Sequence, residues 1–467
     1  MDLSELQHSE TFRDRVSTVT EKGSRNWIYA LKPKGKFYNY RSLLSIFYLL
    51  IFFGLPFVRV HGMPFMQLNV IEGKFILFSK IFWPQDFFIF AIAMIAFVIF
   101  IALFTVVYGR LFCGWVCPQT IFMEMIFRRI EWWIEGSPAT QKLRDKGPWN
   151  GQKIFRKTAK HIIFFGISFL IANTFLSYIV GTDKLFRMIS EPLSEHIGLF
   201  LGLIGFSVLF YAVFAFVREI VCTTICPYGR LQGVLFDPDT MLVAYDHKRG
   251  ETRGKFHKNE KREIGDCIDC NQCVVVCPTG IDIRNGTQLD CVGCTACIDA
   301  CDFMMEKVGL QKGLIRYASE NGIAEGKKLS FTPKIRAYSA LLLILLAVLT
   351  VLMVTRKDID TSIARTAGQL YQELPGDKLS NLYNAKLINK TNKEFPVELK
   401  LENKQGEIRL IGKAGIELKK ESLNEAVFFI VLDKKDIHQH KIPLEIGVYR
   451  NGKKIQTVHT NFLGPFI

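Results

Sequence analysis

The chain has 467 residues, of which 49% are hydrophobic and 22% are charged. This composition excludes a disordered or low-complexity protein, and the length allows two or three domains. Lysine and arginine outnumber aspartate and glutamate by 59 to 44, and the formal charge of +15 indicates either nucleic acid or an anionic membrane face as a partner. The position of these charges along the chain decides between the two.

Five segments are long and apolar enough to cross a bilayer, which requires about 20 residues. Lys, Arg, Asp and Glu are absent from the cores of these segments, which are Ser42–Val60, Asp86–Tyr108, His161–Val180, His196–Val217 and Ala337–Thr355. A single segment of this kind can be a buried core helix, but five in one chain predict a multi-pass membrane protein.

Basic residues in the flanking segments predict the topology. The tail before Ser42 contains eight Lys and Arg residues and the loop 109–160 contains ten, whereas the loops 61–85 and 181–195 contain two each. We therefore expect the tail in the cytoplasm, and the odd number of spans places the residues after Thr355 on the periplasmic side. The positive charge then mostly reflects the excess of Lys and Arg in cytoplasmic segments of membrane proteins, so nucleic acid is not expected as a partner.

Two cysteine pairs directly follow membrane segments. Cys113 and Cys117 form one pair, Cys222 and Cys226 form the other, and a proline follows each pair. Each pair is preceded by a membrane span and an arginine. This order predicts an internal repeat in which the first two spans correspond to the third and fourth. Because residues i and i+4 share one face of a helix, two such pairs around a pseudo-twofold axis would offer four thiolates to one site. The prolines would end or kink the helices there.

These four cysteines are the candidate redox or copper thiols, and three interpretations are open. Thiolates suit Cu(I), and a thiol pair can pass electrons to Cu(II). The four could instead hold a third iron–sulfur centre, or they are reduced structural cysteines at a helix junction. Arg110 and Arg218 lie beside the pairs, where they are expected either to lower the pKa of the thiols or to anchor lipid headgroups.

The segment Ile121–Trp133 follows the first pair. Apolar residues recur there at helical spacing opposite charged ones, and two tryptophans close the segment. This pattern predicts a helix lying in the membrane interface, with core packing as the alternative.

The strongest motif is a pair of cysteine runs with the spacing C-x2-C-x2-C-x3-C. This is the pattern of two-cluster bacterial ferredoxins, in which the fourth cysteine of each run ligates the cluster of the other run. The expected ligands of one [4Fe–4S] cluster are Cys267, Cys270, Cys273 and Cys301, and those of the second are Cys291, Cys294, Cys297 and Cys277. A pair of zinc sites is the alternative. Aspartates near the runs are expected to lower the reduction potentials of the clusters.

The residues after Thr355 contain no cysteine and alternate apolar and polar residues in short runs. The clearest runs are Val397–Leu401, Ile408–Ile411, Ala426–Leu432 and Leu444–Tyr449, and turn signals such as Asn451-Gly452 separate them. This pattern predicts a small β-sandwich.

The sequence therefore predicts a multi-domain membrane protein. It combines an α-helical bundle of about five transmembrane helices, an α+β ferredoxin-like insert for two clusters, and a C-terminal β-sandwich. The expected divisions are a cytoplasmic tail at 1–41, a four-helix membrane domain at 42–230, a cytoplasmic insert at 231–336, a fifth span at 337–355 and an exported domain at 356–467.

This order of elements resembles the cytochrome c oxidase accessory protein family of the FixG/CcoG/RdxA type, whose members are membrane-bound polyferredoxins. The resemblance runs from Trp27 to Pro465 and is carried by Gly109–Gln119 (GRLFCGWVCPQ), Cys222–Gly229 (CTTICPYG) and the eight ferredoxin cysteines. Membrane subunits of the nitrate-reductase electron-transfer type (NapH-like) share the CxxxCP repeat and the ferredoxin insert. The fifth span and the exported domain favour the oxidase accessory family.

The resemblance implies a protein of the bacterial inner membrane that acts in the assembly of cbb3-type cytochrome c oxidase and reduces Cu(II) to Cu(I) for its copper site. It also implies an immunoglobulin-like fold for the exported domain. The expected cofactors are two [4Fe–4S] clusters, with copper as a further candidate. The expected partners are a cytoplasmic electron donor, the lipid bilayer, and oxidase subunits or a copper chaperone. Two alternatives remain, a quinol dehydrogenase subunit and a non-enzymatic assembly scaffold.

Overall fold

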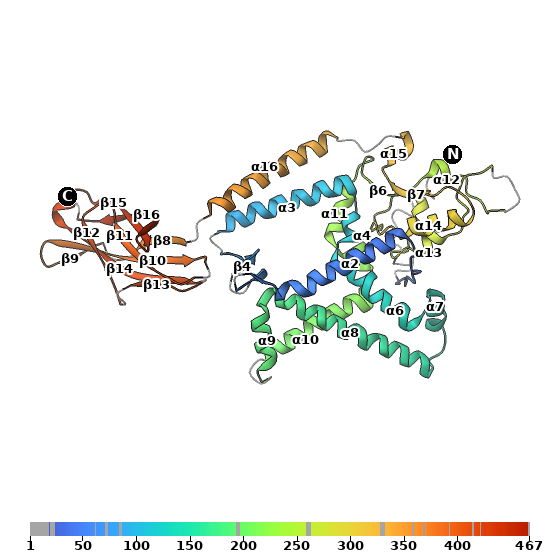
Figure 1. The fold of residues 1–467 in the computed structure, drawn as a ribbon, viewed down its shortest axis with the longest axis horizontal. Coiled ribbons are helices and arrows are strands. Elements are labelled where there is room, and N and C mark those ends of the chain that lie inside the picture. The colour runs from blue at the N-terminus through green and yellow to red at the C-terminus, as the bar shows by residue number, and fades with distance from the viewer. Residues whose placement is uncertain are drawn as a thin grey trace. The chain divides into compact units, whose positions relative to one another are not determined.

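The computed structural model describes residues 18, 24–60, 62–70, 73–83, 86–192, 197–257, 263–326, 332–356, 359–366, 368, 370–391, 393–412, 415–420 and 422–465. Contacts between residues divide the chain into two compact units. The first consists of Met1–Pro56 and Ala91–Ala347, and the second consists of Phe57–Phe90 and Val348–Ile467. Figure 1 shows the ribbon coloured along the chain.

The described residues contain five helices that are long and apolar enough to cross a membrane, as the sequence predicts. They are α2 (Lys36–Gly54), α3 (Phe87–Tyr108), α8 (Gly151–Val180), α10 (Ile197–Ala212) and α16 (Pro333–Thr355). Two of them begin before their apolar segments, α2 at Lys36 and α8 at Gly151. Basic residues of the flanking segments therefore belong to the first turns of these helices.

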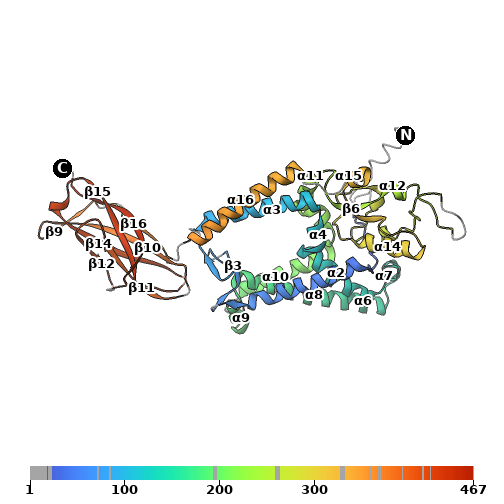
Figure 2. The same ribbon diagram turned by 45° about the horizontal axis from the view of Figure 1, so that its top comes forward.

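The membrane part of the first unit has an aromatic core. Helices α8 and α10 pack against each other, and Figures 1 and 2 show α2 beside them. Two π-helical segments, η3 (Ile121–Phe127) and η4 (Val213–Val217), fill the space between these helices. Phe127 of η3 stacks on Phe214 of η4 with ring centroids 4.5 Å apart, and its edge meets Phe164 of α8. This packing holds η3, which follows the first CxxxCP motif, against η4, which precedes the second.

The prediction of an interfacial helix over Ile121–Trp133 is wrong. The segment forms η3 and the short helix α6 (Arg128–Glu135), and apart from the exposed Trp133 both its apolar and its charged residues are buried or half-buried inside the protein. Arg128 and Glu131 are 1% and 4% exposed, because each is paired with oppositely charged side chains inside the unit. The amphipathic pattern thus reflects a hydrophobic core on one side and a buried ion network on the other.

The ferredoxin-like insert is small and mixes helices with one two-stranded sheet. Strands β6 (Leu242–Tyr245) and β7 (Ile315–Ala318) pair antiparallel, and between them lie α12 (His247–Gly250), α13 (Gln272–Val275) and α14 (Ala296–Lys307). Helix α15 (Glu320–Glu325) follows β7. Val243 and Tyr245 of β6, Ile315 of β7 and apolar residues in and around both cysteine runs form a common core with several of the cysteines.

The insert also holds the start of α2. The backbone N–H groups of Phe37 and Tyr38 donate to the two carboxylate oxygens of Asp299 on α14, at 3.1 and 2.7 Å. A carboxylate at this position satisfies helix amides that have no partner within the helix. Gly35 precedes them because a Cβ there would overlap the Asp299 side chain. The first membrane helix is thereby anchored to the cysteine-bearing segment.

The second unit contains the predicted β-sandwich. The strands of one sheet are β8 (Ile359–Arg365), β9 (Gln372–Leu374), β10 (Lys378–Asn389), β12 (Gly406–Leu410) and β14 (Leu423–Asp433). The strands of the other are β11 (Phe395–Leu401), β13 (Ile416–Leu418), β15 (Lys441–Arg450) and β16 (Lys453–Leu463). Three of the four runs named from the sequence lie wholly in strands, and the fourth, Ile408–Ile411, extends one residue past the end of β12. Asn451-Gly452 forms the tight turn between β15 and β16 with positive φ at both residues.

The sandwich core consists of inward-facing residues from both sheets. Tyr383 and Phe428 are fully buried and stack with ring centroids 5.7 Å apart. Burial of one side chain of this size stabilises the fold by about 2 kcal/mol. The same unit contains the segment 57–90, in which β3 (Met66–Asn69), β4 (Lys74–Leu77) and β5 (Lys80–Phe82) form a meander.

An ion cluster ties the segment before α3 to the sandwich within the second unit. The carboxylate of Asp86 contacts the guanidinium of Arg356 and the ammonium of Lys390, each at 2.7 Å. Asp86 and Lys390 are almost fully buried. Since removal of water strengthens such contacts, this cluster fixes the two ends of the unit to each other.

Candidate metal centre

The two cysteine runs have the same backbone design. Asp269 and Gly293 adopt left-handed conformations at the third position of their runs, and Asn271 and Thr295 do so at the fifth position. Helices α13 and α14 begin directly after the second of these residues. The repeated left-handed turns curl each loop so that its first three cysteines and its backbone N–H groups face one space.

The fourth cysteine of the second run, Cys301, feels the charges of the first run. Burial and the charges of Cys273, Cys270 and Cys267 raise the pKa of Cys301 to about 12. Burial and the charges of Cys294, Cys291, Cys277 and Cys273 raise the pKa of Cys297 well above its usual value. We name Cys267, Cys270, Cys273 and Cys301 the first group, and Cys277, Cys291, Cys294 and Cys297 the second group.

The second group surrounds a cavity that contains hydrogen-bond donors. Cys277, Cys291, Cys294 and Cys297 line this cavity, and Cys273 of the first group also reaches it. Backbone N–H groups in the loop oppose the effect of burial on the pKa of Cys291 and Cys294, because they donate toward these sulfurs. Such donors stabilise thiolates and the sulfur atoms of a bound cluster.

This donor set suits a cluster better than a single ion. Within the described residues, no three Cys, His, Asp or Glu side chains converge at distances suited to one metal ion. A zinc site requires four ligands around one point, whereas a [4Fe–4S] cube binds its four thiolates on four different iron atoms. Four thiols that border a space, with backbone donors beside them, fit the second arrangement.

Arginines offset the negative charge that the sequence places beside the first run. Arg284 contacts the carboxylates of Asp269 and Asp282, and Arg249 contacts that of Asp266 at 2.6 Å. Burial alone would raise the pKa of Asp282, but Arg284 outweighs burial and lowers it. Each of these three aspartates is therefore paired with an arginine.

The CxxxCP pairs lie at breaks between helices rather than on one helical face. Cys113 is in α4 (Leu111–Trp115), whereas Cys117 is extended and precedes the first residue of α5 (Pro118–Thr120). Cys222 is in the π-helix η5 (Val221–Ile225), and Cys226 is extended before α11 (Pro227–Leu235). The prediction of a regular i, i+4 face is thus wrong. The proline keeps the preceding cysteine extended and starts the next helix.

The four CxxxCP thiols nevertheless lie near enough to one another to interact electrostatically, although not at distances suited to one metal ion. Burial and then the charge of Cys117 raise the pKa of Cys222 to about 12, and Cys113 and Cys226 act in the same direction. Burial raises the pKa of Cys113 to about 11, although the charge of Arg110 opposes this increase. Arg110 thus lowers the pKa of Cys113 as expected, but removal from water has the larger effect, so the net pKa is raised.

The two arginines beside the pairs are buried and do not reach lipid headgroups. Arg110 is 4% exposed and donates to the backbone carbonyls of Leu289 and Gly229. Arg218 is 2% exposed and donates to both carboxylate oxygens of Glu131, at 3.1 and 3.0 Å. Arg110 links the first CxxxCP segment to the second cysteine run, and Arg218 belongs to the ion network around α6.

The CxxxCP thiols pack directly against the second cysteine run. Cys113 and Cys222 contact a buried cluster that includes Cys294, and Cys297 also borders this cluster. The two backbones touch at a pair of glycines, since a Cβ on Gly114 would lie 2.6 Å from the carbonyl oxygen of Gly293. The third thiol group therefore lies next to the second group, which in turn adjoins the first.

Three residues that sequence reasoning missed help to form this junction. Gly114 and Gly293 permit the close approach, and the buried Arg41 donates from Nε to the Gly114 carbonyl at 3.0 Å. The positive charge of Arg41 also opposes the raised pKa of Cys294. A glycine inside each cysteine motif and an arginine at the edge of an apolar span were the available sequence signals.

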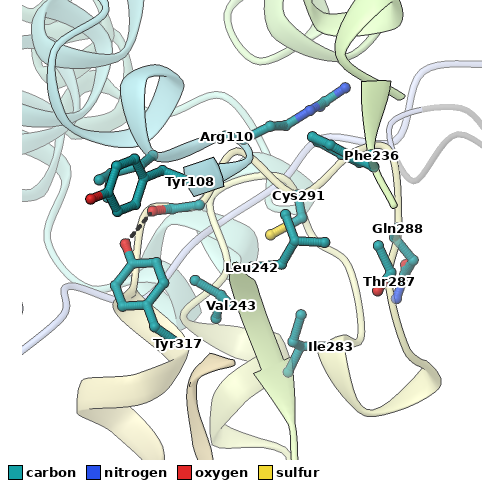
Figure 3. Close-up of a pocket in the computed structure, with 12 residues that line it drawn as sticks. Tyr108, Arg110, Phe236, Leu242, Val243, Ile283, Thr287, Gln288, Cys291 and Tyr317 are labelled. Carbon is teal, nitrogen blue, oxygen red and sulfur yellow. Dashed lines mark hydrogen bonds between the residues drawn. The ribbon is translucent and has the colours of Figure 1, made fainter. Parts of the chain in front are cut away.

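A small pocket of about 20 Å³ lies beside the same junction (Figure 3). Tyr108 and Arg110 line it from the end of α3, and Cys291 and Tyr317 line it from the insert. The Tyr317 hydroxyl donates to the Gly293 carbonyl at 3.5 Å, shown as a dashed line. The loop with Cys291 is thus held between the first CxxxCP segment and strand β7.

Three family models match the chain. A 4Fe-4S binding domain matches residues 90–136, a 4Fe-4S dicluster domain matches residues 217–320, and the IG-like fold at the C-terminal of FixG matches residues 349–465. The first two contain all twelve cysteines between them.

Known proteins are similar over most of the chain. Nitrogen fixation protein FixG of Rhizobium meliloti is 33% identical over 66% of this chain and 60% of its own length. Protein RdxA of Cereibacter sphaeroides is 30% identical over 75% of this chain and 76% of its own length. Protein RdxB of the same organism is 30% identical over 80% of this chain and 82% of its own length.

The helices, the cysteine groups and these matches define a class, the multi-pass membrane iron–sulfur electron-transfer proteins with an immunoglobulin-like C-terminal domain. Within this class, the chain belongs to the FixG/RdxA family.

Proposed function

We propose that this protein reduces Cu(II) to Cu(I) for the copper site of a cbb3-type cytochrome c oxidase during assembly of that enzyme. Electrons would enter at the ferredoxin-like insert and leave at the CxxxCP thiols. The observation that carries this proposal is the packing of Cys113 and Cys222 against the segment with Cys294 and Cys297. Contact of this kind provides a short route between the second cysteine run and a site for a soft metal ion.

The eight ferredoxin cysteines are assigned as cluster ligands in this proposal. Cys267, Cys270, Cys273 and Cys301 would hold the first [4Fe–4S] cluster, and Cys277, Cys291, Cys294 and Cys297 would hold the second. Such clusters, when bound, carry single electrons. The protein contributes the backbone donors beside Cys291 and Cys294 and the positive charge of Arg41, which favour the more negative, reduced state.

The CxxxCP thiols would bind copper as the substrate. Because burial keeps the thiols of Cys113 and Cys222 protonated near neutral pH, binding of the ion releases their protons. Cu(II) then takes one electron and becomes Cu(I), which soft sulfur ligands prefer. The match of a 4Fe-4S binding domain to residues 90–136 favours a second possibility, a third cluster held by the same four thiols.

The proposal includes an orientation in the bacterial inner membrane. The tail 1–41, the first CxxxCP loop and the insert at 231–336 would face the cytoplasm, and the domain at 356–467 would face the periplasm. A cytoplasmic donor would then meet the insert, and a copper chaperone or oxidase subunits would meet the protein at or beyond the membrane. A purely structural assembly scaffold would need neither cluster.

Substitution of one CxxxCP pair tests the proposal. Cys113→Ser/Cys117→Ser should abolish Cu(I) formation by the reduced protein and leave the optical and EPR signals of both clusters intact. Cys222→Ser/Cys226→Ser should have the same effect, because the four thiols form one site. Unchanged copper reduction in both variants would remove these thiols from the mechanism. Normal oxidase assembly by an abundant, cluster-free variant would establish the scaffold role instead.

A further inference from the structure

A groove in the membrane part of the first unit is not used by the proposed copper chemistry. It has a volume of about 620 Å³ and is open on one side. Ile162 and Phe165 of α8 provide apolar walls, Trp149 lies at one end, and His161 and Tyr211 provide polar groups. Trp149 and Ile162 are 72% and 66% exposed, so the groove is accessible from outside the helix bundle.

The groove lies where α8 changes from polar to apolar. The first ten residues of this helix, 151–160, include four Lys or Arg residues, whereas the next twenty, 161–180, include none. This change marks the boundary between headgroups and hydrocarbon. A ligand with a polar ring and a long apolar tail therefore fits the position of the groove.

A histidine–tyrosine pair provides the polar chemistry. Nδ1 of His161 and the hydroxyl of Tyr211 form a hydrogen bond of 2.9 Å. Since this bond uses Nδ1, the other ring nitrogen, Nε2, is the group that can meet a ligand in the groove. A neutral imidazole can accept a proton from a hydroxyl group or donate one to a carbonyl oxygen.

The cations near the groove are already compensated, which argues against a phosphate ligand. Lys157 contacts the carboxylates of Asp145 and Glu135, at 2.6 and 3.3 Å. Lys153 and Arg156 donate to backbone carbonyls. A phospholipid headgroup would have to displace these partners, whereas the oxygen of a quinone ring requires only a neutral donor or acceptor.

A chain of contacts connects the groove to the CxxxCP thiols. The ring of His161 stacks on that of Phe216, with centroids 5.8 Å apart and an interplanar angle of 19°. Phe216 lies two residues before Arg218, whose carbonyl accepts a hydrogen bond of 3.4 Å from the side chain of Gln119. Gln119 follows the Cys117-Pro118 step, so these contacts span the distance between groove and thiols.

We infer that this groove binds an isoprenoid quinol, which is a second, membrane-borne source of electrons beside the cytoplasmic donor of the proposed function. The inference rests on the electron-transfer part of the proposed function and not on copper as the acceptor. Oxidation of the quinol breaks two O–H bonds and yields the quinone, two protons and two electrons. One proton passes to Nε2 of His161 and the other to water at the open side of the groove. The two electrons would pass singly to the iron–sulfur clusters that the ferredoxin cysteines would hold.

Direct binding tests this inference without any turnover. Decylubiquinone is titrated by calorimetry into the purified full chain in detergent, and the protein is expected to bind one molecule. His161→Ala and Ile162→Trp should each weaken binding by about tenfold or more, because the first removes a hydrogen-bonding group and the second fills the groove. His247→Ala, in α12 of the insert, is the matched control and should bind as the unmodified chain does.

Three outcomes would overturn the inference. The unmodified chain does not bind decylubiquinone, both groove variants bind it as tightly as the unmodified chain, or phosphatidylglycerol displaces it fully at equal concentration. The last result would identify a phospholipid site. Copper reduction by the unmodified, chemically reduced chain is measured in parallel. Binding without copper reduction would contradict the proposed function alone, and copper reduction without binding would contradict the groove alone.

Discussion

The ferredoxin runs and the CxxxCP pairs both gather four thiols, but they do so by different means. Each ferredoxin run is a short loop in which two left-handed residues orient three cysteines locally. The CxxxCP site takes one pair from each of two distant segments and depends on helix breaks, buried arginines and tight glycine contact. Local loops can be transferred between folds, whereas the CxxxCP site exists only when the membrane helices are packed.

Removal of one expected cluster ligand from a ferredoxin run should have the largest effect on iron content and copper reduction. Cys294→Ser lacks one sulfur of the second group, so the iron content should fall from about eight to about four atoms per chain, and copper reduction should be lost. Iron analysis and EPR measure this directly. Cys113→Ser is the matched control and should retain the full iron content. Full iron in Cys294→Ser would contradict the ligand assignment.

The second-largest effect should come from a substitution that moves the CxxxCP site away from the second cysteine run. Gly114→Val places side-chain atoms against the Gly293 carbonyl and pushes the CxxxCP site away from the second run. Iron content should be unchanged, but Cu(I) formation by the reduced protein should slow by about tenfold or more. Gly166→Ala in α8, where a Cβ meets no atom within 4 Å, is the control. Equal rates in the two variants would show that the glycine contact is not part of the electron route.

Removal of a buried positive charge between the two regions should have a smaller effect, on the reduction potential of the second cluster. Arg41→Gln removes a buried positive charge whose field reaches Cys294 and a hydrogen bond to Gly114. The reduced cluster is more negative than the oxidised one, so its potential should fall by about 50 mV. Potentiometric EPR titration measures this shift. Arg41→Lys keeps the charge and should shift the potential much less, and an upward shift in Arg41→Gln would refute the electrostatic role.

The smallest effect should be on the stability of the second unit, which contains none of the cysteines. Burial alone would raise the pKa of Asp86, but Arg356 and Lys390 outweigh burial and lower it. A lowered pKa contributes stability above the unfolded value of about 3.9, and this contribution is lost as the pH falls through the folded value. At pH 7, Asp86→Asn should therefore destabilise the second unit by about 2 kcal/mol.

Calorimetric unfolding at two pH values checks this expectation. The difference in stability between the unmodified chain and Asp86→Asn should shrink at acidic pH, where the carboxyl of the unmodified chain becomes protonated. Asp433→Asn is the control. Asp433 is 58% exposed, and its ion pair with Lys378 is long at 3.9 Å, so its loss should change stability little. A difference that does not depend on pH would exclude the ion cluster as its cause.

The features that sequence patterns predicted are those with short-range causes. Strands such as β14 and the turn at Asn451-Gly452 follow from alternation and turn residues, and the membrane helices follow from length and hydropathy. The segment Ile121–Trp133 was misassigned because periodicity reveals two faces but not what covers them. Here Lys160 and Arg218 cover the charged face, and both come from other parts of the chain.

The geometry of the candidate site was only partly predictable for the same reason. The spacing of the ferredoxin runs indicates their grouping, since the loops are local. The pKa values of the CxxxCP thiols depend on burial, and the contact between Gly114 and Gly293 depends on tertiary packing. Neither quantity has a signature in the spacing of residues.

The most direct test of the central claim is one anaerobic experiment on the unmodified chain. Iron and sulfide are counted, the protein is reduced, excess reductant is removed, and Cu(II) is added with a Cu(I)-specific chelator. The account predicts about eight iron atoms per chain and cluster reoxidation that matches Cu(I) formation electron for electron. Clusters that stay reduced in the presence of Cu(II) would contradict copper reduction. An iron content near twelve would show that the CxxxCP thiols hold a third cluster instead.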